Sequence, residues 1–132
     1  MSTTTAAQRR TQAKNEYNAF YAACPSRQLI ARISDKWVAL ILCALGRGGD
    51  PQPMRFSELS RTIAGVSQKM LTQTLRSLEA DGLLTRTVTP TVPVTVTYEL
   101  TDLGLSLHHL VRGIKDWAEG HMDEVLEHRL SV

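Results

Sequence analysis

Apolar residues recur at intervals of three and four along much of the chain, which is the spacing that predicts amphipathic helices. The segment Trp37–Leu45 is apolar on most sides, so we expect a buried helix there. The segments Phe56–Ile63 and Gln68–Ala80 are divided by a tight turn at residues 64–66, and their order is typical of a helix-turn-helix over residues 56–81. The remaining predicted helices cover residues 16–23, 29–33 and 102–130.

Small polar residues and glycines mark the ends of these helices. Ser26, Ser67 and Thr101 are placed to cap the N-termini of the helices that follow them. Gly82 stops the helix after Ser67. Gly113 and Gly120 are expected to bend or interrupt the last helix.

After Gly82 the apolar period changes from about four to two. Residues 84–89 and 94–99 alternate β-branched residues with others, and prolines 90 and 93 stiffen the segment between them. This pattern predicts a β-hairpin, which would form a wing over residues 83–100. The fold class is therefore mainly α with a small β-hairpin wing, in a single winged helix-turn-helix domain over residues 1–132 that begins with a loose arm at residues 1–15.

Length and composition limit the alternatives. A chain of 132 residues fits one compact domain, and no apolar run approaches the roughly 18 residues that a membrane span needs. The N-terminus lacks the apolar core of a secretory signal, and two cysteines are too few for a disulfide scaffold, so we expect a bacterial cytoplasmic protein without membrane partners. No phosphate-binding loop, serine elbow or Cys-x-x-Cys pair is present, so neither a cofactor nor an enzymatic activity is predicted.

Charge is distributed unevenly along the chain. Residues 1–98 hold 12 basic and 6 acidic side chains, whereas residues 99–132 hold 3 basic and 7 acidic ones. This asymmetry favours a polyanionic partner for the basic residues 1–98. The predicted helix Gln68–Ala80 is the strongest candidate for binding a polyanion, because one side of it is polar and free of acidic residues up to Arg76.

Side chains on that polar side suit the major groove of double-stranded DNA. Arginine and lysine bond guanine edges, glutamine pairs with adenine, and a helix N-terminus binds phosphate. A solvent-exposed helix face is the alternative interpretation. The candidate DNA contacts in and around this helix are Ser67, Gln68, Lys69, Thr72, Gln73 and Arg76. Arg86 in the wing, Arg55 before the helix-turn-helix and Lys36 are further candidates for backbone contacts.

Several motifs resemble those of the HxlR-type winged helix-turn-helix regulators of bacteria, within the MarR-like superfamily. They are Cys24-Pro25, Asp35-Lys36-Trp37, Arg55–Leu59, Gly65–Arg76, Leu78–Leu84, Pro93–Thr101 and Gly104. The resemblance covers about residues 24–118. It implies a dimeric, sequence-specific DNA-binding transcription factor, often a repressor, whose terminal helices build the dimer. The partner would be a pseudo-palindromic operator, with each subunit reading one half-site.

Cys24 is a candidate sensor residue. It precedes a predicted helix N-terminus, which lowers thiol pKa, and the resemblance implies sensing of oxidants, quinones or aldehydes at this Cys-Pro position. A structural cysteine packed under the helix is the alternative. Cys43 lies inside an apolar helix and is expected to be inert. Modification of Cys24 or a small-molecule effector would then modulate DNA binding.

The last helix has a longer apolar pattern than one small domain covers, so we expect a homodimer. Its candidate interface residues are Tyr17, Phe20, Tyr21, Leu110, Ile114, Trp117 and Leu126. A dimerising interaction module that does not bind DNA remains the alternative function. The four histidines of this helix are expected to be exposed, with no metal site predicted.

Overall fold

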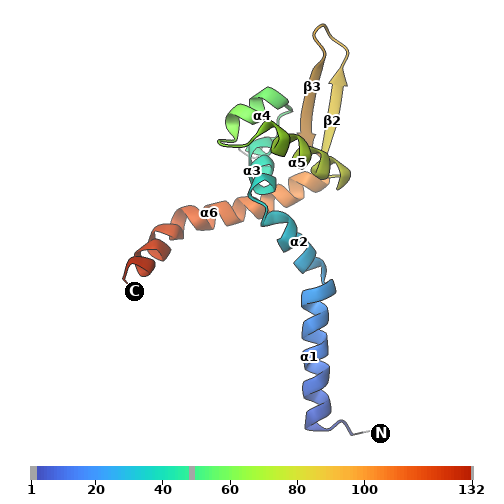
Figure 1. Cartoon of the computed structure of the whole chain (residues 1–132), viewed down its shortest axis with the longest axis vertical. Coiled ribbons are helices and arrows are strands. Elements are labelled where there is room, and N and C mark those ends of the chain that lie inside the picture. Colours follow the sequence, from blue (N-terminus) through green and yellow to red (C-terminus); the bar gives the residue numbers. More distant parts are fainter. Residues whose placement is uncertain (1–2, 48–49, 132) are drawn as a thin grey trace. The chain divides into compact units, whose positions relative to one another are not determined.

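A computed structural model describes residues 3–47 and 50–131, without the side chains of residues 15–23. The chain divides into two compact units, Met1–Asp35 and Lys36–Val132. The sequence predicted a single domain, and the winged helix-turn-helix lies entirely in the second unit. Figure 1 shows the helices and strands of both units.

The first unit holds helices α1 (Ala6–Ala23) and α2 (Pro25–Ile33). A loose arm was expected for residues 1–15, but α1 begins at Ala6. A reciprocal pair of hydrogen bonds explains this start, because the Gln8 backbone N–H donates to Thr5 Oγ1 over 3.1 Å and the Thr5 N–H donates to Gln8 Oε1 over 2.8 Å. This is the capping box, which satisfies two backbone donors that a helix start otherwise leaves open.

The start of α2 also differs from the prediction. Its N-cap is Cys24, not Ser26, and Pro25 takes the first helical position. Proline suits that position because it has no N–H to satisfy there and its φ angle is already helical. The backbone N–H of Arg27 donates to the Cys24 carbonyl oxygen over 3.0 Å, which closes the first turn.

The core of the second unit is built on α3 (Lys36–Leu45), the predicted buried helix. Around it lie α4 (Phe56–Thr62), α5 (Gln68–Ala80) and α6 (Asp102–Leu130). The large side chains that are almost completely buried come from α3, α4, α5 and the segment just after Gly82, and they are Val38, Ile41, Leu42, Leu45, Leu59, Leu71, Leu75, Leu78 and Leu84.

Helices α4 and α5 form the predicted helix-turn-helix. The turn needs Gly65, whose φ of 81° is costly for a residue with a side chain. Ser67 then caps α5 as predicted, since its Oγ accepts the Met70 backbone N–H over 3.0 Å. Gly82, with a φ of 75°, follows the last turn of α5, and the chain continues from it into the wing.

The wing is a three-stranded antiparallel sheet in the order β1-β3-β2. The predicted hairpin is present as β2 (Leu84–Thr89) and β3 (Thr95–Leu100). The additional strand β1 (Met54–Arg55) was not predicted and pairs with residues 97–98 of β3. It joins the start of α4 to the wing, and the hairpin extends past α5 beside it (Figure 1).

Helix α6 runs without interruption for 29 residues. Gly113 and Gly120 do not break it, contrary to expectation, because a helix tolerates isolated glycines at a modest cost in free energy. Thr101 is the N-cap as predicted, with its Oγ1 accepting the Gly104 N–H over 3.1 Å and donating to the Gly82 carbonyl over 2.6 Å. This residue therefore fastens the start of α6 to the end of α5.

One histidine of α6 is not on the surface. His108 is 4% exposed and packs against Gly46, whereas His109 and His121 are exposed as expected. In the part of the chain that the structure describes, no helix combines the length and apolar character required to cross a membrane.

Candidate nucleic-acid interface

Helix α5 presents its polar side chains to solvent. Gln68, Lys69, Gln73 and Arg76 are exposed and Thr72 is half-buried, which agrees with the predicted polar side. The opposite side packs into the core through Leu71, Leu75 and Leu78. Two details differ from the predicted apolar side: Met70 is only half-buried, and Thr74 is buried in its place.

Thr74 is tolerated in the core because its hydroxyl is satisfied within the helix. Its Oγ1 donates to the Met70 carbonyl oxygen over 2.7 Å. The hydroxyl of Thr72 is used in the same way and donates to the Gln68 carbonyl over 2.8 Å. A threonine whose hydroxyl bonds its own helix offers mainly its methyl group to a partner.

The N-terminus of α5 offers several donors together. The backbone N–H groups of Gln68 and Lys69 lie in the first turn, where a helix has no acceptor of its own for them. The Ser67 oxygen accepts from Met70, which leaves the hydroxyl hydrogen available as a donor. Together with the positive end of the helix dipole, these groups form a suitable cradle for a phosphate.

A groove of about 500 Å³ lies between α5 and the wing. It brings Gln68, Thr72 and Arg76 of α5 together with Arg86 of β2, all of which were predicted from the sequence. Tyr98 of β3, the register partner of Arg86, also lines it and was missed because a tyrosine in an alternating strand pattern has no distinguishing signal. The acidic side chain that lines this groove is Glu79.

Two other predicted contacts lie apart from this groove. Arg55 is exposed in β1 and precedes α4, and its backbone N–H donates to Glu58 Oε1 over 3.3 Å. Lys36 opens α3 with its ammonium group 4.5 Å from the ring centre of Trp37. Neither lines the groove between α5 and the wing.

A second hollow of about 450 Å³ borders the N-terminal ends of α4 and α5. It is lined by Phe56, Ser57, Ser60, Arg61 and Gln68, so Gln68 and Phe56 belong to both hollows. Arg61 was not among the predicted contacts. Its position on the short helix before the turn is the signal that could have identified it, since the first helix of a helix-turn-helix crosses the DNA backbone.

Comparison with known proteins agrees with the helix-turn-helix and wing seen in the structure. Residues 32–126 match the HxlR family, described as HxlR-like helix-turn-helix. The chain belongs to this family. The HTH-type transcriptional regulator YtfH of Escherichia coli K12 is 44% identical over 115 residues, which span 87% of this chain and 88% of YtfH.

Solved structures of other proteins support the assignment to the HxlR family. The putative transcriptional regulator ytfH from Salmonella typhimurium superimposes with a TM-score of 0.72 at 43% identity, covering 83% of this chain and 95% of that one. The redox regulator HypR in its oxidized form gives a TM-score of 0.66 at 36% identity and covers 74% and 97% of the two chains. This HxlR-family protein is thus an HTH-type transcriptional regulator and not an enzyme.

The candidate sensor of this HxlR-family regulator is half-buried at the start of α2. The backbone N–H and then the hydroxyl of Ser26 lower the pKa of the Cys24 thiol, with a smaller contribution from the Arg27 N–H, while burial opposes them. The pKa of the Cys24 thiol is therefore lowered, which is the direction that the sequence predicts. Burial raises the pKa of the Cys43 thiol, and nearby Lys115 partly offsets this rise.

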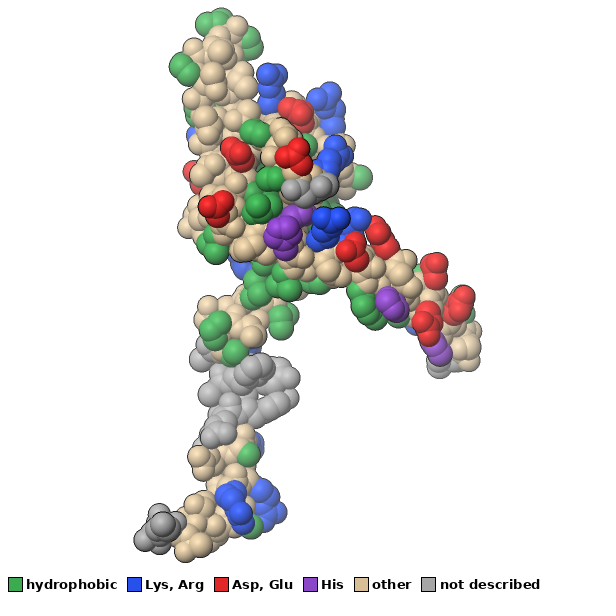
Figure 2. All heavy atoms as spheres, turned by 180° about the vertical axis from the view of Figure 1, so that it is seen from behind, with side chains coloured by type: hydrophobic (Ala, Val, Ile, Leu, Met, Phe, Trp, Pro, Cys, Tyr) green, Lys and Arg blue, Asp and Glu red, His purple; other side chains and the backbone are tan. Residues whose placement is uncertain are grey.

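The predicted dimer residues of α6 are exposed to between 46% and 54% in the single chain. At about 100° per residue, Leu110, Ile114 and Trp117 form one stripe, whereas Leu126 lies about 160° around the helix from Leu110. The four residues therefore do not share one side of α6. Acidic side chains gather along the C-terminal part of the same helix (Figure 2). The side chains of Tyr17, Phe20 and Tyr21 lie outside the described residues.

Proposed function

We propose that this regulator binds a pseudo-palindromic DNA operator as a homodimer and acts as a repressor. The observation that carries the proposal is the groove in which Arg76 of α5 and Arg86 of the wing occur together. Two arginines on a helix and a neighbouring hairpin suit DNA, whose major groove admits the helix while the wing follows the backbone or the minor groove.

Each candidate side chain has a role that its position supports. Gln68, Lys69, Gln73 and Arg76 face base edges or phosphates in the major groove, and Thr72 offers its methyl group to a thymine. Ser67 and the first N–H groups of α5 hold a phosphate. The positioning contacts to the DNA backbone come from Arg86, Arg55, Lys36 and, from the structure, Arg61.

The exposed apolar stripe of α6 supports dimerisation. Leu110, Ile114 and Trp117 each expose about half of their surface, and an exposed apolar patch of this kind marks an interface. We place the dimer interface on the helices of residues 102–130 and 16–23, with Tyr17, Phe20 and Tyr21 as partners of the stripe and Leu126 on a separate contact. The acidic end of α6 would then point away from the phosphates.

Two kinds of signal would control the repressor. Cys24 combines partial exposure with a lowered pKa, which favours reaction with oxidants or electrophiles. A small ligand is the other kind. Either one changes DNA affinity only if it favours one state of the dimer over another.

The first experiment measures affinity for a duplex from upstream of the protein's own gene against a scrambled duplex, at two salt concentrations. A preference of at least about a hundredfold and a steep salt dependence are expected. Arg76→Gln should weaken specific binding by about 1–3 kcal/mol if it reads a base. Arg86→Gln should instead reduce the salt slope by about 2 for a dimer, since each phosphate contact contributes about 0.9.

Arg129→Gln is the matched control, because Arg129 is an exposed base in the last turn of α6. It should leave affinity and salt slope unchanged. Equal, weak binding to all duplexes, including those from a genomic-fragment selection, would contradict DNA recognition and favour the interaction module. Specific binding that survives Lys69→Gln together with Arg76→Gln would contradict the assignment of α5 as the helix that reads the operator.

The dimer is tested by light scattering at micromolar concentration. Ile114→Glu should convert a dimer to a monomer, because it places a charge in the middle of the stripe. Val92→Glu, at the fully exposed tip of the wing, should leave the dimer intact. A monomeric unmodified protein would refute the assignment.

A further inference from the structure

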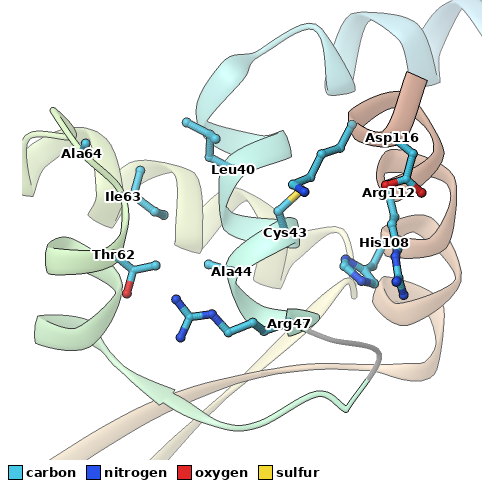
Figure 3. A pocket seen from close by; sticks show the side chains of 11 residues that line it. Leu40, Cys43, Ala44, Arg47, Thr62, Ile63, Ala64, His108, Arg112 and Asp116 are labelled. Carbon is cyan, nitrogen blue, oxygen red and sulfur yellow. The ribbon is translucent and has the colours of Figure 1, made fainter. Parts of the chain in front are cut away.

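Another groove lies between α3, the end of α4 and α6 (Figure 3). Its volume of about 650 Å³ is in the range of small-molecule sites. Leu40, Ala44 and Ile63 supply apolar walls, and basic side chains border them. All of its residues belong to the second compact unit.

His108 gives this groove an unsatisfied polar group. Its Nδ1 lies 3.0 Å from the Leu42 carbonyl oxygen, and because a carbonyl only accepts, Nδ1 carries the hydrogen. In the neutral ring Nε2 is then a lone-pair acceptor. This Nε2 is buried and has no hydrogen-bond partner among the residues that the structure describes. A buried polar atom without a partner lowers stability, so its retention needs an explanation.

The imidazole ring of His108 packs tightly against the backbone at Gly46. A Cβ added at Gly46 would overlap the His108 imidazole, so the ring packs directly against the glycine. The ring therefore has little freedom to turn and find another partner inside the protein. Figure 3 shows the imidazole beside Cys43 and Arg112 in the groove.

The charges at this groove favour an anion. Arg47, Arg112 and Lys115 line it together with one acid, Asp116. Lys115 is already engaged by Glu119 over 2.6 Å. For the guanidinium groups of Arg47 and Arg112 no ion pair is found within the described ranges 3–47 and 50–131. Guanidinium groups are well suited to carboxylates, which they bind through two parallel hydrogen bonds.

We propose that this groove binds a small organic acid that also carries a hydroxyl group. The carboxylate pairs with Arg112 and Arg47, the carbon skeleton packs on Leu40 and Ile63, and the hydroxyl donates to His108 Nε2. Because Nε2 is buried, the side chains that cover it must shift for the hydroxyl to reach it. Cys43 stays a neutral thiol in the wall, because burial disfavours its charged form.

The position of the groove couples it to DNA binding. Thr62, Ile63 and Ala64 line it and immediately precede Gly65 and Ser67, the turn and cap that lead into α5. A ligand wedged between α6 and this turn displaces the start of α5 and weakens operator binding. Only this consequence rests on the proposed function; binding of the acid does not.

Calorimetry on the full-length protein tests the site with 4-hydroxybenzoate as the probe. Benzoate, which lacks the donor, and 4-methylphenol, which lacks the carboxylate, should each bind about tenfold more weakly. Arg112→Gln should weaken 4-hydroxybenzoate about tenfold, whereas Arg129→Gln on the same helix should not change it. A long-range nitrogen spectrum of the histidine rings should show a protonated Nδ1 and a shift at Nε2 of His108 alone.

No saturable binding of 4-hydroxybenzoate up to about 10 mM overturns the proposal, and so does binding that Arg112→Gln leaves unchanged. Operator affinity measured with and without the probe separates the two proposals. Ligand binding without any specific DNA binding would refute the proposed operator binding but would leave the proposed ligand site supported. Operator binding that the probe does not change, with ligand bound, would refute the coupling.

Discussion

At Gly104 the first turn of α6 passes close to the backbone that joins α5 to β2. A Cβ added there would overlap the Leu83 carbonyl oxygen and would lie 2.9 Å from the Leu83 carbonyl carbon and 3.2 Å from Leu100 Cδ2. The overlap is with backbone, which cannot rotate away. Gly104→Ala therefore requires the first turn of α6 to move away from the segment that joins α5 to β2.

This movement would strain two hydrogen bonds that hold the junction. The Thr101 N–H donates to the Leu83 carbonyl over 3.1 Å, and Thr101 Oγ1 donates to the Gly82 carbonyl over 2.6 Å. At about 1 kcal/mol for each bond and 1–3 kcal/mol for overpacking, less about 1 kcal/mol of gained helix propensity, the net loss is about 2–4 kcal/mol.

Urea denaturation followed by circular dichroism at fixed protein concentration measures this loss. Gly120→Ala is the matched control, since nothing in the described structure lies within 4 Å of a Cβ built there. It should raise stability by about 0.5–1 kcal/mol through helix propensity. The reasoning is refuted if Gly104→Ala is as stable as the unmodified protein or as Gly120→Ala.

Two further outcomes are expected from the cap and the thiols. Ser67→Ala removes the acceptor of the Met70 N–H and should lower the melting temperature by about 4 °C, whereas Ser106→Ala, in the interior of α6, should not lower it. At pH 7, iodoacetamide should alkylate Cys24 faster than Cys43, because a lowered pKa increases the thiolate fraction and a raised one decreases it. Mass spectrometry of peptides distinguishes the two sites, and equal rates would contradict the assignment.

Helix α5 could be predicted to the residue because both of its ends depend on local chemistry. Ser67 bonds a backbone group three residues on, and Gly82 supplies a conformation that other residues avoid. Neither feature needs a distant partner. The same holds for Thr101 at the start of α6, where the cap is again three residues from its donor.

Features that depend on distant partners were missed. Strand β1 consists of two residues, and it exists because Met54 and Arg55 pair with β3 more than forty positions later. No periodic pattern arises from two residues. The burial of His108 likewise depends on the Leu42 carbonyl, 66 positions away, and on the missing side chain of Gly46.

The start of α1 was missed for a different reason. Thr5 and Gln8 carry the capping-box spacing, so the signal was local, but the helix that follows has no apolar period in its first part. Helix prediction from periodicity detects the side that packs on a core, and residues 6–14 are exposed throughout. A helix without such a side is recognised only from its cap.

Two polar side chains that are buried in the described part of the chain, Thr74 and His108, differ in how their hydrogen-bonding groups are satisfied, and the difference indicates where a ligand would act. Thr74 lies on the buried side of α5, and its hydroxyl is satisfied within that helix by the Met70 carbonyl. His108 is buried to a similar degree, but one nitrogen is satisfied and the other is not. Because an unsatisfied group gains most when a donor arrives, binding energy at the groove is available to move the turn before α5.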